Sequence, residues 1–246
     1  MKSKDYQRRF YRDKLFSPGL KPLHYLQKET DLYILTDKAL AQGLISSKVE
    51  ALRSDIEKYI RKDPGFEHAL KPLAIELRAP LIIRLMSKAA LRAGVGPMAS
   101  VAGAVAQLLG EALIKKGCQE VIIENGGDIF LKVRSLRRIG FYSGKGKFAN
   151  KLALLIRPGD TPIGICTSSA TLGHSLSFGA AESVTVLAKD AALADAVATA
   201  ACNRVKSPKD MENALNFCRS IRGVSAAVIV MANKLATFGK IEFSRR

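Results

Sequence analysis

The feature that most constrains the fold is a long run of strand-like segments with no helical pattern between them. Between residues 120 and 188, six short apolar stretches are separated by turns and loops. Strands joined by short turns pair antiparallel, whereas parallel strands need long helical crossovers. The sequence therefore predicts an α+β fold with mostly antiparallel sheets. The six segments are 120–123, 129–133, 138–142, 152–157, 163–167 and 183–188.

Helical patterns lie on both sides of this strand-rich region. Ser47 and Glu50 have the spacing of a capping box, which predicts the start of a helix that runs to Tyr59. A strand is predicted before it, over 30–36. The other predicted elements are helices over 80–92, 98–116, 190–203 and 208–218, and a closing hairpin over 224–231 and 235–243.

The first part of the chain has a different character. Residues 1–28 are basic and contain the breakers Pro18-Gly19 and Lys21-Pro22, so we expect an irregular N-terminal arm. The remaining patterns show no internal repeat and no low-complexity stretch. We therefore expect one domain over residues 1–246 that begins with this arm.

Composition narrows the class of protein. The chain has 246 residues, 48% of them hydrophobic, and a net charge of +17. The charge favours anionic partners, but no nucleic-acid-binding motif accompanies it, so nucleic acid is not expected. No charge-free apolar run of about 18 residues and no signal peptide are present, which predicts a cytoplasmic protein without a membrane span. The four cysteines form no CxxC pair, which argues against zinc and for reduced, buried thiols.

The predicted helix over 190–203 carries the best candidate for a metal site. Asp195 and Thr199 lie four residues apart, which places a carboxylate and a hydroxyl one turn apart on one face. The rest of the helix is rich in alanine, and a buried carboxylate needs a cation or several hydrogen-bond donors. The pair can hold Mg²⁺ or Ca²⁺ together with backbone carbonyls. The alternative is an ordinary surface or capping pair.

A loop rich in hydroxyl groups follows the strand that ends near Thr167. Hydroxyl and backbone N–H groups in such a loop can bind phosphate or carbonyl oxygens, and His174 is the candidate general base. The alternative is a plain polar turn, because no acidic residue is close enough in the sequence to orient the histidine. Cys166, just before the loop, is either a buried thiol or a nucleophile. The loop contains Thr167, Ser168, Ser169 and His174.

A Gly-Gly-Asp turn separates two of the predicted strands. Gly126, Gly127 and Asp128 are either only a hairpin turn or a backbone surface for a flat ligand, with Asp128 making polar contacts. Glu124 adds a second carboxylate just before the turn. The chain has neither a G-x-G-x-x-G motif after a strand nor a P-loop, which excludes the Rossmann and P-loop classes.

Taken in order, these segments resemble those of a known family. The ordered set ENGGDI (124–129), the TSS…GH loop (167–174), SVTVLAKD (183–190) and ADAVATA (194–200) resembles the ApbE-like superfamily. The best-known members of this superfamily are FAD:protein FMN transferases. The segment VGPMASVAG (95–103) and others in the first half resemble a compact, uncharacterised branch of it. The resemblance covers nearly the whole chain.

The resemblance implies a T-fold-related structure and a site for a divalent metal and FAD. In the transferases, a metal near FAD polarises the pyrophosphate, and a threonine hydroxyl of an acceptor protein attacks the FMN phosphorus. The implied metal ligands are Asp195, Thr199 and the backbone carbonyl of Ala99. The implied flavin or nucleotide pocket is lined by Gly126, Gly127 and Asp128.

The chain also departs from the family pattern. The family histidine precedes an Asp-Pro-x-Thr-Gly segment, whereas His174 is followed by Ser-Leu-Ser-Phe-Gly, and Ser100 stands at the position of a family lysine. Because the Asp195 and Thr199 pair is retained, we expect a metal-dependent flavin or nucleotide site that performs FMN transfer. The alternative is a non-catalytic ligand-binding or assembly protein that has lost this chemistry. A third hypothesis is an anion-binding module that uses the basic arm.

Overall fold

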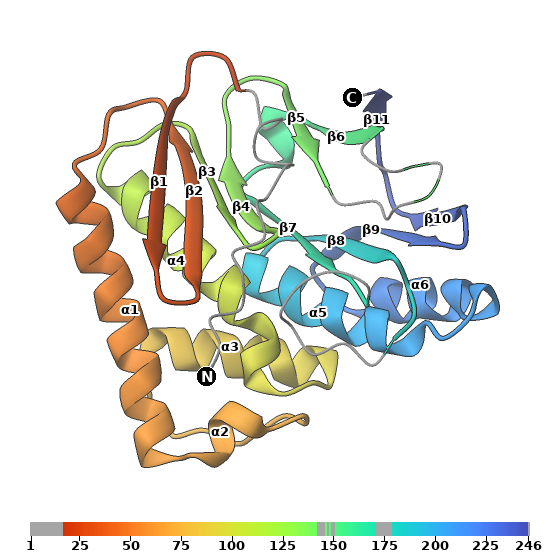
Figure 1. The fold of residues 1–246 in the computed structure, drawn as a ribbon, viewed down its shortest axis with the longest axis horizontal. Helices are drawn as coiled ribbons and strands as arrows, with labels where there is room; N and C mark the ends of the chain where they lie inside the picture. The colour runs from red at the N-terminus through yellow and green to blue at the C-terminus, as the bar shows by residue number, and fades with distance from the viewer. Residues whose placement is uncertain (1–16, 142–145, 147, 149–150, 171–178, 246) are drawn as a thin grey trace.

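The computed structural model describes residues 17–141, 146, 148, 151–170 and 179–245, and it has an α+β architecture (Figure 1). One large sheet contains eight strands and a smaller sheet contains three. Every strand pairing among the described residues is antiparallel, so the predicted fold class is confirmed. The large sheet has the order β1 (Lys21–Gln27), β2 (Thr30–Thr36), β3 (Val121–Asn125), β4 (Asp128–Lys132), β7 (Ile163–Ser168), β8 (Ser183–Ala188), β9 (Val224–Met231) and β10 (Lys234–Phe238).

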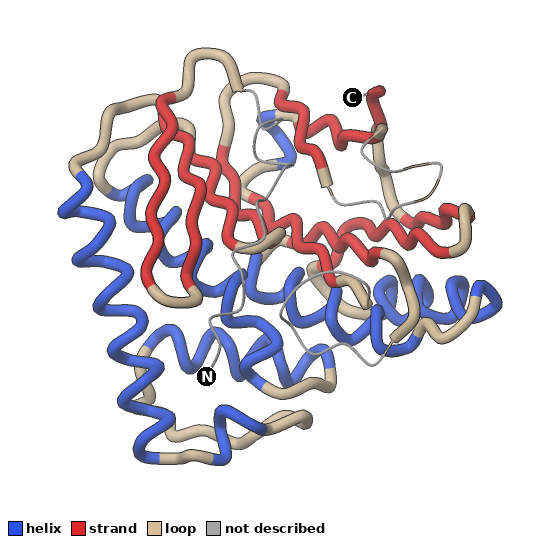
Figure 2. Tube along the Cα trace, viewed as in Figure 1, coloured by secondary structure: helices blue, strands red, loops and turns tan. Residues whose placement is uncertain are grey.

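Helices cover one face of the large sheet, and the small sheet covers the other (Figure 2). The small sheet has the order β11 (Phe243–Arg245), β6 (Leu152–Ile156) and β5 (Arg137–Gly140). The helices are α1 (Gln42–Lys62), α2 (Gly65–His68), α3 (Leu81–Ala93), α4 (Val101–Lys115), α5 (Ala191–Arg204) and α6 (Met211–Ser220). A 3-10 helix, Pro97–Ser100, leads directly into α4.

The large sheet separates two apolar cores. Along β3, Val121 and Ile123 pack toward the helices, whereas Ile122 packs toward the small sheet. Along β7, Cys166 faces the helices and Ile165 faces the small sheet. This alternation is the ordinary two-residue period of a strand, and burial on both faces makes the central strands continuously apolar. It also decides which polar side chains at the strand ends can meet.

Two elements near the start of the chain differ from the sequence prediction. Residues 21–27 are not irregular, because they form β1 and pair with β2 over its full length. Helix α1 begins at Gln42 with Ala41 at its N-cap, so the capping box at Ser47 is wrong. Its apolar stripe extends upstream through Ile45, which is fully buried, and this packing sets the helix start. The rest of the predicted arm, residues 1–16, lies outside the described residues.

The predicted closing hairpin is correct only in its first part. β9 and β10 pair antiparallel, but β10 ends at Phe238. Gly239 then adopts a positive φ of 83° and lies against the backbone of Ser225, which turns the chain away from β9. The chain continues into β11, which pairs with β6 in the small sheet.

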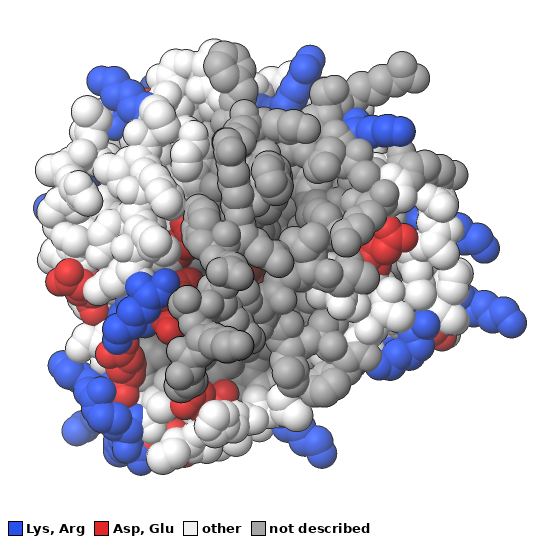
Figure 3. Space-filling view, in the orientation of Figure 1, with Lys and Arg blue, Asp and Glu red and all other residues white. Residues whose placement is uncertain are grey.

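One helical segment of the described chain, Pro97–Lys115, is long and apolar enough to cross a membrane by length and composition alone. Most of this segment is buried, because α4 packs against β3, β4 and the neighbouring helices. Charged side chains of both signs are dispersed over the described part of the face in Figure 3, and they do not form one basic block there.

Candidate functional site

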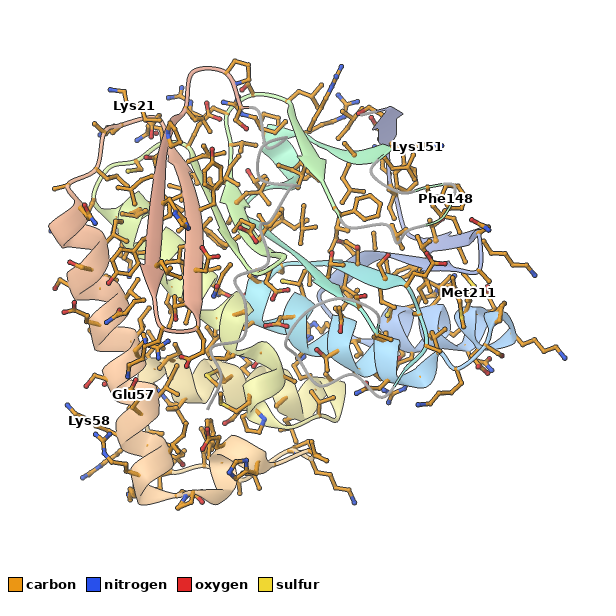
Figure 4. All side chains as sticks on the ribbon, in the orientation of Figure 1. Lys21, Glu57, Lys58, Phe148, Lys151 and Met211 are labelled. Carbon is orange, nitrogen blue, oxygen red and sulfur yellow. The ribbon has the colours of Figure 1, made fainter. Side chains whose placement is uncertain are left out.

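The candidate site lies where the N-terminal end of α4 meets α5 and the ends of β3, β4 and β7. Side chains fill the layer between these helices and the sheet (Figure 4). Asp128 and Cys166 are directly opposite each other on β4 and β7. The amide Nδ2 of Asn125, which ends β3, donates to the carbonyl oxygen of Ala102 at 3.2 Å. The fold therefore brings the Gly-Gly-Asp turn beside the first turn of α4.

Asp195 of α5 caps the neighbouring helix α4. The backbone N–H of Gly103 donates to Oδ2 of Asp195 at 2.9 Å. The first N–H groups of a helix have no partner within it, and a carboxylate there is stabilised by the helix dipole. The capping position itself, Ser100, supplies no side-chain bond to these groups. The structure therefore accounts for a carboxylate in this apolar layer through backbone donors.

A second capping bond runs in the opposite direction. Oε1 of Gln107, on α4, accepts the N–H of Ala192 in the first turn of α5 at 3.3 Å. The two helices approach closely because Gly103 has no side chain. A Cβ atom there would overlap the carbonyl oxygen of Ala191 and lie 2.9 Å from Cβ of Asp195. The small residues of the 98–116 segment therefore serve close helix packing.

Three ionisable side chains, those of Asp128, Cys166 and Asp195, lie close together at this site. Burial raises the pKa of Asp195 to about 7, although the N–H groups of Gly103 and Ala102 act in the opposite direction. Burial, and then the nearby Asp195 carboxylate, raise the pKa of Asp128 well above its usual range. Asp195 nevertheless retains some accessible surface. Removal of both carboxyl protons is costly unless a cation enters.

Cys166 has the properties of a buried thiol. Its side chain is inaccessible, and Sγ donates to the carbonyl oxygen of Ala191 at 3.3 Å. Burial, followed by the charges of Asp128 and Asp195, raises the pKa of this thiol well above its usual range. A nucleophilic cysteine needs a lowered pKa and exposure. The geometry therefore supports the buried-thiol alternative.

The three proposed metal ligands lie on adjoining elements. Asp195 and Thr199 are one turn apart on α5, and α5 packs against the 3-10 helix that contains Ala99. Thr199 is half-buried, and its hydroxyl has no hydrogen-bond partner among the described residues. Within those residues, no three His, Cys, Asp or Glu side chains are grouped as metal ligands. A cation here would rely on one carboxylate and neutral oxygens, a donor set that fits Mg²⁺ or Ca²⁺.

The Gly-Gly turn is a two-residue hairpin loop. Gly126 and Gly127 have φ of 71° and 104°, and Asn125 pairs with Asp128 across the turn. Positive φ at both central residues is the geometry that glycine adopts without strain. Oε1 of the buried Glu124 accepts the N–H of Gly127 at 2.7 Å, which fixes this peptide. The glycines thus have a structural role, and Gly126 remains exposed.

The hydroxyl residues after β7 do not form one cluster. Oγ1 of Thr167 shares a hydrogen bond with Oγ1 of Thr185 at 2.9 Å, on the side of the small sheet. Ser168 follows it in the strand and therefore faces the helices. Oγ of Ser169 donates to the carbonyl oxygen of Glu182 at 2.7 Å. His174 lies outside the described residues.

Two cavities of the structure lie away from this site. One, of about 200 Å³, is bounded by β6, β7 and the segment before β11, and it includes Arg157 and Lys240. The other, of about 240 Å³, lies between α1 and α4. Neither is lined by Asp128 or Asp195. The case for the site therefore rests on its chemistry.

Without divalent cations, stability is expected to fall as the pH rises from about 4 to about 7. The pKa of Asp195 is about 7 in the folded protein against an ordinary 3.8, so the folded protein keeps a proton that the unfolded chain releases. The unfolding free energy then falls by up to about 1.4 kcal/mol per pH unit. The raised pKa of Asp128 acts in the same direction.

Urea unfolding in EDTA at a series of pH values measures this slope. Asp195→Asn removes one titrating group and is expected to flatten the profile. An equally steep profile in the variant would show that Asp195 does not titrate in this range.

Comparison with known proteins places the chain among related sequences. The profile of a family described as "AbpE bacteria" matches residues 13–237. A protein named UPF0280 from Methanospirillum hungatei is 47% identical over 180 residues, which is 73% of each chain. A UPF0280 protein from Methanocella arvoryzae is 36% identical over 90% of this chain and 89% of the relative.

Solved structures share the fold at low sequence identity. The apo form of the Pseudomonas stutzeri flavinyl transferase ApbE matches with a TM-score of 0.60 and 13% identity, over 89% of this chain and 94% of that one. The ApbE protein of Thermotoga maritima matches with a TM-score of 0.56 and 13% identity, over 91% and 96%. At such identity the likeness concerns the fold.

Proposed function

Because this chain belongs to the family described as AbpE bacteria, within the ApbE-like superfamily, we propose that it binds FAD with a divalent cation and transfers FMN to an acceptor protein. Two observations suggest this activity: one protein of the same fold is a flavinyl transferase, and the sequence motifs follow one another in the order typical of such transferases. The proposal depends on the chemistry of the site where α4 and α5 meet.

The observation that carries the proposal is the grouping of Asp128 and Asp195 at the N-terminal end of α4. When both are ionised, these neighbouring carboxylates repel an anionic pyrophosphate. A divalent cation held by Asp195 would offset this repulsion. The accessible part of Asp195 and the hydroxyl of Thr199, which has no partner among the described residues, are suited to hold it.

Each proposed residue has a defined task. Asp195, Thr199 and the carbonyl of Ala99 hold the cation, which, when bound, neutralises charge on the pyrophosphate. The exposed backbone of Gly126 offers a flat surface to the ligand, and the bond from Glu124 keeps the next peptide in place. His174 is proposed to take the proton of the attacking hydroxyl.

The proposed reaction is a phosphoryl transfer from FAD to the acceptor protein. The hydroxyl oxygen of the acceptor threonine forms a bond to the FMN phosphorus. The bond from that phosphorus to the bridging oxygen breaks, AMP leaves with this oxygen, and the hydroxyl proton passes to the base. Ser168 is proposed to contact the ligand with its side chain, and Thr167 and Ser169 with their backbone groups, because the hydroxyls of these two residues are bonded elsewhere.

A second candidate is a binding or assembly protein without catalysis. It is favoured by the capping bond from Gly103 to Asp195, which explains this carboxylate without a cation. The Ser-Leu-Ser-Phe-Gly sequence after His174 also replaces the Asp-Pro segment of the transferases.

Thermal unfolding with FAD, FMN, ATP or no ligand, each with and without Mg²⁺, tests the proposal. We expect FAD to raise the melting temperature only when Mg²⁺ is present, because a cation held by Asp195 would neutralise charge on the pyrophosphate. A saturating ligand at about 100 times its Kd adds about 2.7 kcal/mol of stability, which is easily measured. A cation-independent shift with ATP alone would assign another substrate class. No shift with any nucleotide would contradict the proposed site.

A further inference from the structure

Four leucines on α3 and on the loop that precedes it are exposed to solvent. Helix α3 lies on the helical side of the large sheet, away from the small sheet (Figure 1). Leu70 and Leu77, in the loop over 69–80, are 62% and 94% exposed. Leu81 and Leu91, on α3, are 59% and 70% exposed. Scattered exposed leucines are ordinary, but several on adjoining segments mark a surface of interaction.

The loop and the helix adjoin each other because the loop begins beside the C-terminal end of α3 and ends at its N-terminus. Ala69 lies against Gly96, just beyond the C-terminal end of α3, where a Cβ on Gly96 would overlap the Ala69 carbonyl. The loop ends at Pro80, directly before α3 begins. Leu73 and Ile75 pack inward against the core, so the exposed loop side chains face away from it.

Leu77 is at the tip of a turn. The N–H of Ala79 donates to the carbonyl oxygen of Glu76 at 3.0 Å, which makes Leu77 and Arg78 the two central residues. The carboxylate of Glu76 is paired with Lys62 at 2.6 Å. The tip therefore presents one aliphatic and one cationic side chain. The charge of the neighbouring Glu76 is already balanced by Lys62.

The outer face of α3 is cationic between its two exposed leucines. Leu81, Arg84, Lys88 and Leu91 are its exposed positions, and their spacing of three, four and three residues forms one stripe. The helix contains no acidic residue. We call the exposed set the α3 surface; it consists of Leu70, Lys71, Leu77, Arg78, Leu81, Arg84, Lys88 and Leu91.

We propose that the α3 surface docks the protein on an anionic lipid bilayer. Protruding leucines insert at the boundary of headgroups and acyl chains, and adjacent lysines and arginines pair with anionic headgroups. Protein interfaces typically pair anchoring side chains with pockets on the facing surface. The α3 surface instead projects its leucines outward, at a turn tip and along a helix, as insertion into a bilayer requires. Neither described cavity includes a residue of this surface. The contact is peripheral and independent of the flavin site.

Sedimentation with lipid vesicles tests this docking. The full chain is mixed with vesicles of phosphatidylcholine alone, or of phosphatidylcholine and phosphatidylglycerol in equal parts. We expect binding only to the vesicles that contain phosphatidylglycerol. Leu77→Glu, which places a charge at the turn tip, is expected to lower the partition coefficient at least about 10-fold.

Leu136→Glu is the matched control. Leu136 is 51% exposed and precedes β5 of the small sheet, and its substitution changes the net charge by the same amount. We expect this variant to bind like the parent. Equal melting temperatures of both variants and the parent would show that they fold alike.

Three results would overturn the proposal. The first is that the parent does not bind the anionic vesicles. The second is that Leu77→Glu binds like the parent. The third is that Leu136→Glu loses as much binding as Leu77→Glu. The last two would assign vesicle binding to the overall positive charge instead of the α3 surface.

Discussion

Replacing Asp195 with alanine is expected to abolish the stabilisation by Mg²⁺ and to lower FMN transfer at least about 100-fold. Asp195 is the one carboxylate in the proposed donor set, since Thr199 and the Ala99 carbonyl contribute neutral oxygens. Loss of this charge removes most of the attraction for a hard divalent cation. Titration calorimetry of Mg²⁺ in the presence of FAD, with release of AMP as the readout of transfer, measures both effects.

The same substitution has a structural effect that must be separated from the metal effect. Alanine cannot accept the N–H of Gly103, and loss of such a capping bond costs about 1 kcal/mol. Asp195→Asn keeps an acceptor oxygen while it removes the charge, so we expect it to retain the cap and lose the Mg²⁺ response. A parental Mg²⁺ response in Asp195→Asn would contradict the metal assignment.

Thr199 offers a second way to separate the two roles. It makes no hydrogen bond among the described residues, so its hydroxyl has no visible structural task. If Thr199 is a metal ligand, Thr199→Val weakens the Mg²⁺ response and Thr199→Ser keeps it, because only serine retains the oxygen. The capping role of Asp195 would be unaffected by either change.

The sequence predicts the elements of the site better than their contacts. Helical spacing places Asp195 and Thr199 on one face of α5, and turn chemistry identifies the hairpin at Gly126 and Gly127. The donor to Asp195, however, is the amide of Gly103, 92 residues away in the chain. A backbone group carries no residue-type signal, so the capping role could only come from tertiary structure.

Two other differences have identifiable physical causes. Pro22 is a strand breaker and predicts an irregular segment, but β1 is an edge strand of the large sheet, where proline is tolerated. The sequence places Thr167 and Ser168 together in one hydroxyl-rich loop. Both residues lie in β7, however, where neighbouring side chains face opposite sides of the sheet. Asn125 has the sequence signal of a turn only, yet its side chain links β3 to α4.

Gly103→Ala is expected to destabilise the protein by about 3 kcal/mol. The added methyl group would overlap the Ala191 carbonyl oxygen and lie 2.8 Å from its carbonyl carbon. Backbone atoms cannot rotate away as a flexible side chain would, so α4 and α5 must separate. That movement also lengthens the bond between Gly103 and Asp195, and the variant should therefore lose Mg²⁺-dependent stabilisation as well.

Gly43→Ala is the matched control for this change. Gly43 also lies in a helix, but a Cβ there would have no atom within 4 Å. Since alanine is the better helix former, this variant should be more stable by up to about 1 kcal/mol. Urea unfolding of both variants gives the two free-energy changes. Opposite signs would establish that the close approach of α4 and α5, and not helix propensity, requires glycine at position 103. A neutral Gly103→Ala would mean that the two helices are not tightly packed at the site, and the capping of α4 by Asp195 would then need revision.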